Sequence, residues 1–342
     1  MIKQIEKQQY HEFWRENKGS PLQSWHWGEV KKETWEVRRL GVFEDEKLVA
    51  VANVFIRILP FSVIMKMLGA TRFAYIPRGI CVKSCGKYPG IMRELTNHFS
   101  ILEVAFILID PDLRFDTEEW NDSMQKAFES NGWGIGGMTI DPNQTNIVKL
   151  QKTEEELLKA MKPKWRRNIK KAIRQGVTVK EVSDDSAIDS FYSVMQLVVQ
   201  NTDFKIREKA YFERIWRELK PDELVKIFVA EYKGEVVSSY LVLINDYAAY
   251  EIYGGATKKG RDVEASYLLK WEIMKKMKAE EKKYYDHWGV APKEDSNHPL
   301  SGISYFKSGF GGRYVQLLPQ YVKVFNRKVY SLYTLGKRFI KH

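Results

Sequence analysis

Apolar, β-branched residues gather around short polar turns at two distant places along the chain. At each place the pattern predicts a strand, a turn and a second strand, as in a β-hairpin. The four strands are expected at 35–43 and 48–56 in the first half, and at 224–232 and 235–243 in the second. The hydrophobic pattern therefore predicts that one structural unit occurs twice.

Each hairpin is followed by a further strand region, a helix and then an apolar strand that reaches an aspartate. The helices are expected near 88–100 and 263–279, and the strands after them reach Asp110 and Asp286. Alternating strands and helices of this kind predict an α+β fold built by internal duplication.

Both halves then carry a helix that stops on glycine before an aromatic strand. The matching sequences are Phe128-Glu-Ser-Asn-Gly and Phe306-Lys-Ser-Gly. This pairing places Glu129 where the second half has Lys307, so the two halves differ in charge at an equivalent position.

The boundary between the halves is expected near 147–151, just before two predicted helices. The first begins at Thr153, which forms a capping-box pattern with Glu156. The second has Pro163 in its first turn and Gly176 at its end.

The second of these helices carries seven cations: Lys162, Lys164, Arg166, Arg167, Lys170, Lys171 and Arg174. Its apolar side is expected to consist of Trp165, Ile169, Ala172 and Ile173. Like charges at i, i+4 spacing repel one another, which favours an anionic partner such as a nucleic-acid backbone. A solvated basic face without a partner is the alternative.

Composition agrees with two domains and an anionic partner. The chain has 342 residues and a formal net charge of +11. Its two cysteines, Cys81 and Cys85, lack the further ligands of a zinc site, and we expect free thiols and no metal. We find no signal peptide, and the most apolar stretch, 54–68, is broken by charges and a proline, so a cytoplasmic protein is expected.

The order of these elements resembles two tandem GNAT acyltransferase domains, and with the basic helix it resembles the FemABX family of tRNA-dependent aminoacyltransferases. The resemblance covers nearly the whole chain. It is carried by Trp27-Gly-Glu-Val-Lys31, Tyr75-Ile-Pro-Arg-Gly79, Asp110-Pro111, the basic helix, Arg207-Glu-Lys-Ala-Tyr211-Phe212, Tyr253-Gly-Gly255, Tyr285-Asp-His-Trp-Gly289 and Tyr305-Phe-Lys-Ser-Gly-Phe-Gly311.

The resemblance implies how the domains are divided. No heptad run marks a coiled-coil arm between 190 and 220, so the chain resembles the compact members of the family. In these the chain end returns to the first domain, here through 318–325. The expected domains are 1–148 plus about 318–342, and 149–317.

The resemblance also implies a reaction. An amine on the stem peptide of a UDP-linked or lipid-linked muropeptide attacks the ester of an aminoacyl-tRNA, and no cofactor is needed. Lys307 is expected to stabilise the oxyanion or the departing ribose oxygen, and Asp110 to orient or deprotonate the amine. Without the resemblance, Lys307 reads as a solvated lysine at a helix end, and Asp110 as a turn residue.

Further substrate-binding residues follow from the same resemblance. Lys31 and Arg207 are expected to hold the pyrophosphate of the precursor, with Tyr211 and Tyr253 lining the groove. Phe306 and Arg78 complete the predicted substrate-binding set. For tRNA the predicted contacts are Lys164, Arg166, Arg167, Lys170, Lys171 and Arg174.

Two other functions stay open at this stage. An acyl-CoA N-acyltransferase would hold pyrophosphate on the loop Lys258-Lys-Gly-Arg-Asp262, although Asp262 would repel it. A tRNA-binding or membrane-surface-binding protein without catalysis is the second. The basic and aromatic segment 327–341 is compatible with peripheral contact to an anionic membrane, and the missing arm favours a monomer.

Overall fold

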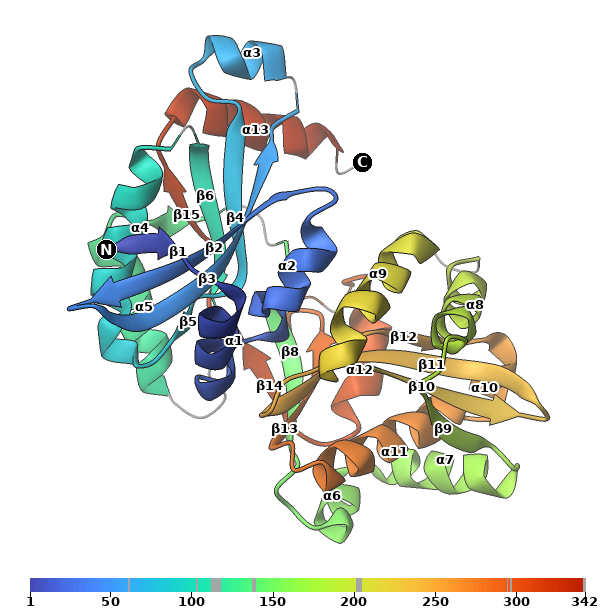
Figure 1. Ribbon diagram of the computed structural model, residues 1–342. Coiled ribbons are helices and arrows are strands. Elements are labelled where there is room, and N and C mark those ends of the chain that lie inside the picture. Colours follow the sequence, from blue (N-terminus) through green and yellow to red (C-terminus); the bar gives the residue numbers. More distant parts are fainter. Residues whose placement is uncertain are drawn as a thin grey trace. The chain divides into compact units, whose positions relative to one another are not determined.

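The computed structural model describes residues 1–60, 62–102, 104–111, 118–136, 140–200, 205–293, 295 and 297–340. The chain forms two compact units, each with its own sheet (Figure 1). Unit 1 comprises Met1–Asn143 and Leu317–His342, and unit 2 comprises Gln144–Gln316. The sequence boundary after residue 148 therefore falls inside a strand of unit 2.

Unit 1 contains most of the first half of the chain and its last strand and helix. Its strands are β1 (Ile2–Gln4), β2 (Glu36–Glu44), β3 (Lys47–Ile58), β4 (Arg72–Gly79), β5 (Cys81–Val82), β6 (Val104–Pro111), β7 (Gly134–Ile135) and β15 (Tyr321–Val324). Its helices are α1 (Lys7–Glu16), η1 (Pro21–Gln23), α2 (Trp25–Lys31), α3 (Ser62–Met67), η2 (Cys85–Lys87), α4 (Tyr88–Ser100), α5 (Glu118–Ser130) and α13 (Arg327–Ile340).

The sheet of unit 1 runs in the order β1-β2-β3-β4-β6-β15-β7, with β5 beside β3. The β4–β6 pair is parallel because α4 crosses between these strands, whereas the neighbouring pairs are antiparallel. The returning strand β15 lies between β6 and β7. The last segment of the chain thus completes the first sheet.

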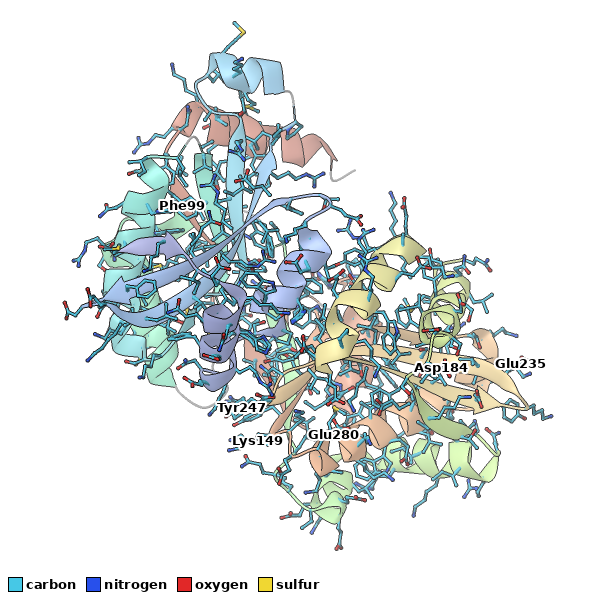
Figure 2. The ribbon with its side chains drawn as sticks, viewed as in Figure 1. Phe99, Lys149, Asp184, Glu235, Tyr247 and Glu280 are labelled. Carbon is cyan, nitrogen blue, oxygen red and sulfur yellow. The ribbon has the colours of Figure 1, made fainter. Side chains whose placement is uncertain are left out.

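Alternation along the strands decides which side chains face which layer. Ile107 and Ile109 face the core formed with α4 and α5, to which Phe99 on α4 also contributes (Figure 2). Phe106, on the opposite face, packs against Tyr330 and Tyr333 of α13. Both faces of the central strands are buried, which explains their nearly continuous apolar sequences.

Unit 2 repeats this plan. Its strands are β8 (Gln144–Lys149), β9 (Thr178–Val182), β10 (Val225–Tyr232), β11 (Glu235–Ile244), β12 (Ala248–Ala256), β13 (Tyr284–Gly289) and β14 (Arg313–Gln316). Its helices are α6 (Glu154–Ala160), α7 (Pro163–Arg174), α8 (Ala187–Val199), α9 (Lys209–Leu219), η3 (Lys220–Asp222), α10 (Lys258–Asp262), α11 (Ala265–Ala279) and α12 (Ser301–Ser308).

Strand pairing in the two sheets corresponds step by step. The series β2-β3-β4-β6-β15-β7 matches β10-β11-β12-β13-β8-β14, and in both the third and fourth strands are parallel. Helices α4 and α11 occupy the same place, between the parallel strands. The duplication expected from the sequence is therefore present in the fold. In each sheet, one strand (β15 or β8) comes from a distant part of the chain.

The two helices predicted after the boundary are α6 and α7. Thr153 and Glu156 form the expected capping box. In α7, Trp165, Ile169 and Ala172 are buried against the core that also contains α11. The prediction for Ile173 is wrong: it is 55% exposed, because it lies at the margin of the packed stripe, about 70° around the helix from its centre.

Three further sequence expectations concern helices. The segment 190–220 contains the end of α8 and the whole of α9, while residues 201–204 lie outside the described part. The basic segment at the C-terminus forms α13, and residue 341 also lies outside that part. Of the helices that the structure describes, none has both the length and the apolar character needed to cross a bilayer.

Candidate active site

The first candidate site is a buried polar cluster at the end of β6 in unit 1. Asp110 is 5% exposed, and its carboxylate accepts hydrogen bonds from the Tyr75 hydroxyl and from Nε2 of Gln320, the latter 2.9 Å from Oδ1. Tyr75 and Asp110 share one sheet face because Tyr75 pairs with Leu108 in the parallel register. Gln320 directly precedes β15, so the returning strand delivers a residue to the cluster.

Asp110 can exchange a proton near neutral pH. Burial raises the pKa of its carboxyl to about 6, and the negative charge of the neighbouring Asp141 raises it further. Hydrogen bonds from Tyr75 and Gln320 and the positive charge of Arg78 act in the opposite direction and lower this pKa. The Tyr75 hydroxyl also lies 2.8 Å from Oδ2 of Asp141. A phenol has a single proton to donate, so this arrangement is best satisfied when one carboxyl is protonated.

Arg78 belongs to the same cluster, whereas Lys31 lies elsewhere in unit 1. The Arg78 guanidinium is buried and donates to the backbone carbonyl of Pro142. Lys31 is the last residue of α2, and its Nζ lies 4.8 Å from the ring centroid of Trp27. Asp110 and Arg78 are thus brought together, while Lys31 sits against an aromatic ring on a different element.

The second candidate site surrounds Lys307 in the last turn of α12 in unit 2. Its Nζ donates a 2.8 Å hydrogen bond to the carbonyl of Gly289, the last residue of β13. Burial lowers the pKa of Lys307 to about 8, helped by the positive charge of Lys270 and opposed by Glu251 and Asp286. An ammonium with such a pKa can hold a developing negative charge and also release a proton near neutral pH.

A buried ion pair lies next to Lys307, and sequence reasoning missed it. Lys270 and Glu251 are 0% and 3% exposed, and the Lys270 Nζ lies 2.6 and 2.7 Å from the two carboxylate oxygens. The Tyr285 hydroxyl donates to the same carboxylate at 2.6 Å. The Lys270 Nζ also lies 5.0 to 5.5 Å from the ring centroids of Tyr240, Phe306 and Phe310.

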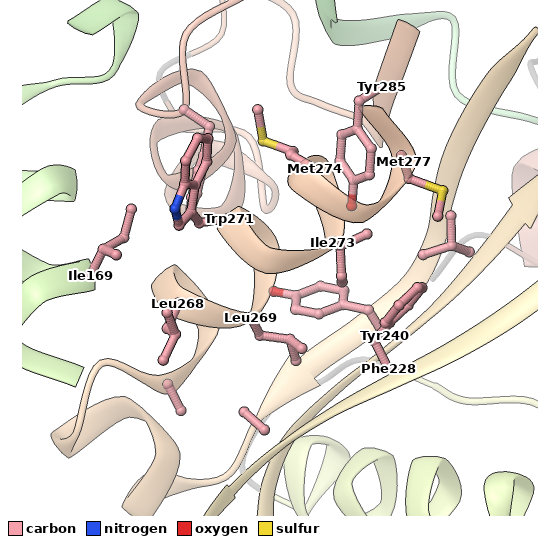
Figure 3. Close-up of a cluster of buried hydrophobic side chains, with 14 of the residues drawn as sticks. Ile169, Phe228, Tyr240, Leu268, Leu269, Trp271, Ile273, Met274, Met277 and Tyr285 are labelled. Atoms are coloured by element: carbon pink, nitrogen blue, oxygen red, sulfur yellow. The ribbon is translucent and has the colours of Figure 1, made fainter. Parts of the chain in front are cut away.

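The position of this pair explains how charge is placed inside an apolar core. Figure 3 shows the Tyr240 and Tyr285 hydroxyls among the apolar side chains of α11. A bulge in β12 lets Glu251 face α11, whereas Tyr253, two residues on, packs against Phe212 of α9. The sequence signal was a charge inside each of two largely apolar runs, Ala248–Ala256 and Ala265–Met274. Charges in such runs are uncommon unless they are paired.

His287 on β13 completes the surroundings of Lys307. It is fully buried, and neither ring nitrogen has a hydrogen-bond partner among the described residues. Its ring lies between Tyr285 and Phe310, with centroids at 5.0 and 5.7 Å. Burial, together with the charges of Lys270 and Lys307, lowers the pKa of His287 well below its usual value, so the imidazole is neutral.

The basic helix is attached directly to the segment that carries Lys307. Trp165 of α7 donates from its indole nitrogen to the carbonyl of Phe306 at 3.0 Å, and the Lys162 amide donates to the carbonyl of Gly309 at 2.9 Å. The indole packs so closely on Gly309 that a Cβ there would lie 2.1 Å from a ring carbon. The predicted tRNA-binding helix and the predicted catalytic lysine are therefore neighbours in unit 2.

The six predicted tRNA contacts separate into two groups. Lys164, Arg167, Lys170 and Arg174 are exposed on α7. Arg166 donates to three carbonyls at the end of α6, the shortest being 2.7 Å to Met161. Lys171 forms an ion pair of 3.2 Å with Glu264 and also bonds the carbonyl of Asp262. Two of the six thus have structural contacts within unit 2.

The remaining predicted substrate residues form a separate group in unit 2. The Arg207 guanidinium lies 5.8 Å from the Tyr211 ring, and Phe212 contacts both Tyr211 and Tyr253 with centroids at 5.6 and 5.0 Å. This group belongs with α9, whereas Lys270 and Glu251 face α11. Of the predicted substrate residues that belong to unit 2, Phe306 is the neighbour of Lys307 in α12.

The backbone amides of the loop considered for coenzyme A are hydrogen-bonded within the loop itself. The Gly260 amide donates to the Thr257 side chain at 3.1 Å, and the Arg261 amide donates to the Thr257 carbonyl at 3.0 Å. A Cβ on Gly260 would lie 2.2 Å from the carbonyl oxygen of Val237. This glycine therefore permits close packing, and these amides are committed to the helix cap instead of facing a phosphate.

The fold and the comparisons with known proteins now define the class. The architecture is that of two tandem GNAT-like domains, and it resembles a crystal structure of FemX with a TM-score of 0.85 at 19% identity, covering 97% of this chain and 99% of that one. A tandem GNAT protein from the clavulanic acid biosynthesis pathway matches with a TM-score of 0.51 at 12% identity, over 95% and 98% of the two chains. These likenesses concern the fold.

The family follows from the sequence. The FemAB family model matches residues 5–233 and 222–338, and the chain belongs to this family. It is 28% identical over 226 residues to a lipid II:glycine glycyltransferase of Staphylococcus saprophyticus, covering 64% of this chain and 52% of that protein. The corresponding enzyme of Staphylococcus aureus is 28% identical over 235 residues, with coverages of 66% and 54%. The chain thus spans about half the length of these curated relatives.

Proposed function

We propose that this protein is an aminoacyltransferase that moves an amino acid from aminoacyl-tRNA to an amine on the stem peptide of a peptidoglycan precursor. The observation that carries the proposal is the attachment of the basic helix α7 to the segment containing Lys307. A cationic surface suited to RNA backbone lies beside a half-buried ammonium suited to acyl transfer. The glycyltransferases among the relatives support the same chemistry.

The reaction assigns a role to each cluster. The acceptor amine attacks the ester carbonyl, the carbonyl oxygen becomes negative, and collapse forms an amide and releases the ribose oxygen. Lys307 stabilises the oxyanion or supplies a proton to the ribose oxygen, and the amine loses one proton. Asp110 binds the acceptor amine as a carboxylate and accepts this proton, for which a pKa of about 6 is suited. Aminoacyl-tRNA is the co-substrate, and the proposed chemistry requires no metal or other cofactor.

The acceptor we favour is lipid-linked, because the relatives are named for lipid II. We place the enzyme in the cytoplasm at the membrane surface, where aminoacyl-tRNA and such an acceptor meet. Arg78, beside Asp110, and the group of Arg207, Tyr211 and Tyr253 would contact the precursor, with Lys31 on its pyrophosphate. The four exposed cations of α7 would contact tRNA phosphates.

A mass-spectrometric transfer assay tests the proposal. The protein is incubated with UDP-linked or lipid-linked pentapeptide precursor and with tRNA charged with all amino acids, while a parallel tube contains acetyl-CoA instead of tRNA. We expect the acceptor to gain the mass of one or more amino-acid residues only with tRNA, and a glycine residue is the first to look for. A gain only with acetyl-CoA, or none with either acceptor, would contradict the proposal.

A further inference from the structure

One end of unit 1 gathers segments from four parts of the chain. Ile58, the last residue of β3, pairs with Arg72 at the start of β4, which in turn pairs with Val104 at the start of β6. The Asn326 amide donates to the carbonyl of Ala105 at 2.9 Å, so α13 begins at this same end. The Asn326 side chain also donates to the carbonyl of Leu68 at 2.6 Å, which links the start of α13 to the segment after α3.

Large apolar side chains project into solvent at this end. They belong to β3, α3, the turn before β6, and α13. The exposed fractions are 63% for Ile58, 84% for Met67, 81% for Ile101, 41% for Leu332 and 50% for Leu335. Figure 1 shows α3 and α13 at this end of the unit 1 sheet.

Helix α13 has two apolar faces, and the sheet covers one of them. Val329 and Tyr333 are buried, and the Tyr333 ring lies 4.8 Å from that of Phe106. On another side, Lys328, Leu332 and Leu335 are exposed at i, i+4 and i+7, which places them on one stripe. Exposed leucines can enter a membrane interface, and a neighbouring lysine can extend its ammonium to the lipid phosphates while its stem covers apolar surface.

The charges around these apolar side chains are positive. Arg57, Lys66, Arg327 and Lys328 are exposed here. The sequence contains no Asp or Glu from 47 to 93, and none after Asp295. Glu36, from β2, is engaged in ion pairs with Arg72 and Arg38, and Glu103 lies outside the described residues.

We propose that this end of unit 1, the α3–α13 face, docks on an anionic lipid bilayer. Its apolar side chains enter the interface while the cations contact lipid phosphates, each cation strengthening binding by about fivefold. Isolated apolar side chains on short projecting segments, interspersed with cations, fit a headgroup layer. A protein interface would instead need one continuous apolar core. The inference deepens the proposed function, since a lipid-linked acceptor would be met at this surface, but its test requires no catalysis.

Cosedimentation with vesicles provides the test, using phosphatidylcholine alone and an equal mixture of phosphatidylcholine and phosphatidylglycerol. We expect binding to the anionic vesicles only. The charge variant Lys66→Glu/Arg327→Glu/Lys328→Glu is expected to weaken binding by about two orders of magnitude. Met67→Ser/Leu332→Ser/Leu335→Ser is expected to weaken it at least tenfold. The matched control, Lys164→Glu/Arg167→Glu/Lys170→Glu on α7, has the same change in charge and is expected to retain binding.

Circular dichroism and the thermal midpoint confirm that each variant is folded. All nine substituted positions are exposed, so native values are expected. The proposal is overturned if wild-type protein does not bind anionic vesicles or binds neutral vesicles equally well. It is also overturned if the α7 control loses binding while the α3–α13 variants keep it. Transfer to a UDP-linked acceptor in solution is expected to be unchanged in the α3–α13 variants, which separates this outcome from failure of the proposed function.

Discussion

The indole nitrogen of Trp165 donates a 3.0 Å hydrogen bond to the backbone carbonyl of Phe306, the residue before Lys307. Trp165 is the buried anchor of α7, whose exposed side carries four cations. Any partner bound to those cations is therefore connected through one rigid side chain to the segment that positions Lys307. The contact therefore couples the position of the basic helix to that of Lys307.

Gly309 tests this connection directly. A Cβ at Gly309 would lie 2.1 Å from the Trp165 ring, so Gly309→Ala must displace the indole or the end of α12. We expect a loss of about 1–3 kcal/mol in the free energy of unfolding and at least a tenfold loss in transfer rate. Gly302→Ala, in the first turn of the same helix with nothing within 4 Å of the added Cβ, is the control and should change neither. Equal effects of the two variants would exclude the connection.

The pH dependence of Lys307 follows from its lowered pKa of about 8. If the ammonium is the active form, its contribution is complete below that pH and declines as the pH rises through 8. We expect the ratio of wild-type to Lys307→Met single-turnover rates to fall about tenfold per pH unit above 8. Taking the ratio cancels the ionisation of the acceptor amine. A ratio that stays constant up to pH 10 would show that Lys307 is not the titrating group.

Asp110→Asn is expected to stabilise the protein while damaging catalysis. The folded pKa of Asp110 is raised to about 6, so its ionisation favours the unfolded chain, and wild-type protein loses stability from about pH 4 to pH 6. The asparagine amide can donate to Tyr75 while its carbonyl accepts from Gln320. We expect unfolding to cost about 2–3 kcal/mol more in the variant at pH 7, with little difference at pH 4, by urea denaturation. A destabilised variant at pH 7 would contradict this view of the cluster.

The exposed cations of α7 and the cations that bond within unit 2 should respond differently to substitution. Replacing Lys164, Arg167 or Lys170 by Gln is expected to weaken aminoacyl-tRNA binding and to lower the salt slope by about 1 for each phosphate that is no longer neutralised. Arg166→Gln removes the donor to three α6 carbonyls and should mainly lower stability, by about 1–2 kcal/mol. Fluorescence titrations at several salt concentrations, with thermal melts alongside, distinguish the two effects. Salt-independent binding would remove α7 from the tRNA interface.

The sequence predicted the secondary structure well because apolar and polar positions follow clear strand and helix periods in both halves. The hairpins, α4 and α11 appear where the apolar pattern placed them, since buried strands and amphipathic helices impose those periods. The position of Asp110 at the end of an apolar strand was also readable. Its partners were not, because Gln320 is 210 residues away and reaches Asp110 only through the position of β15 in the sheet.

The surroundings of Lys307 depended on details that no local pattern encodes. Glu251 faces Lys270 because a bulge shifts the alternation of β12 by one residue. The ring nitrogens of His287 are buried and have no hydrogen-bond partner among the described residues, although the sequence around His287 predicts an ordinary strand. Charge counting found six cations in α7 and a seventh, Lys162, just before it. It could not separate Arg166 and Lys171, which bind within unit 2, from those facing solvent.

Single-turnover transfer from pre-charged aminoacyl-tRNA to a lipid-linked precursor, compared between wild-type protein and Lys307→Met, tests the central claim most directly. We predict that wild-type protein forms the amide, and that the variant does so about 100–1000-fold more slowly while binding both substrates with unchanged Kd. A variant that transfers at the wild-type rate would refute the role of Lys307. A wild-type protein that binds charged tRNA but forms no amide would contradict the assignment as an aminoacyltransferase.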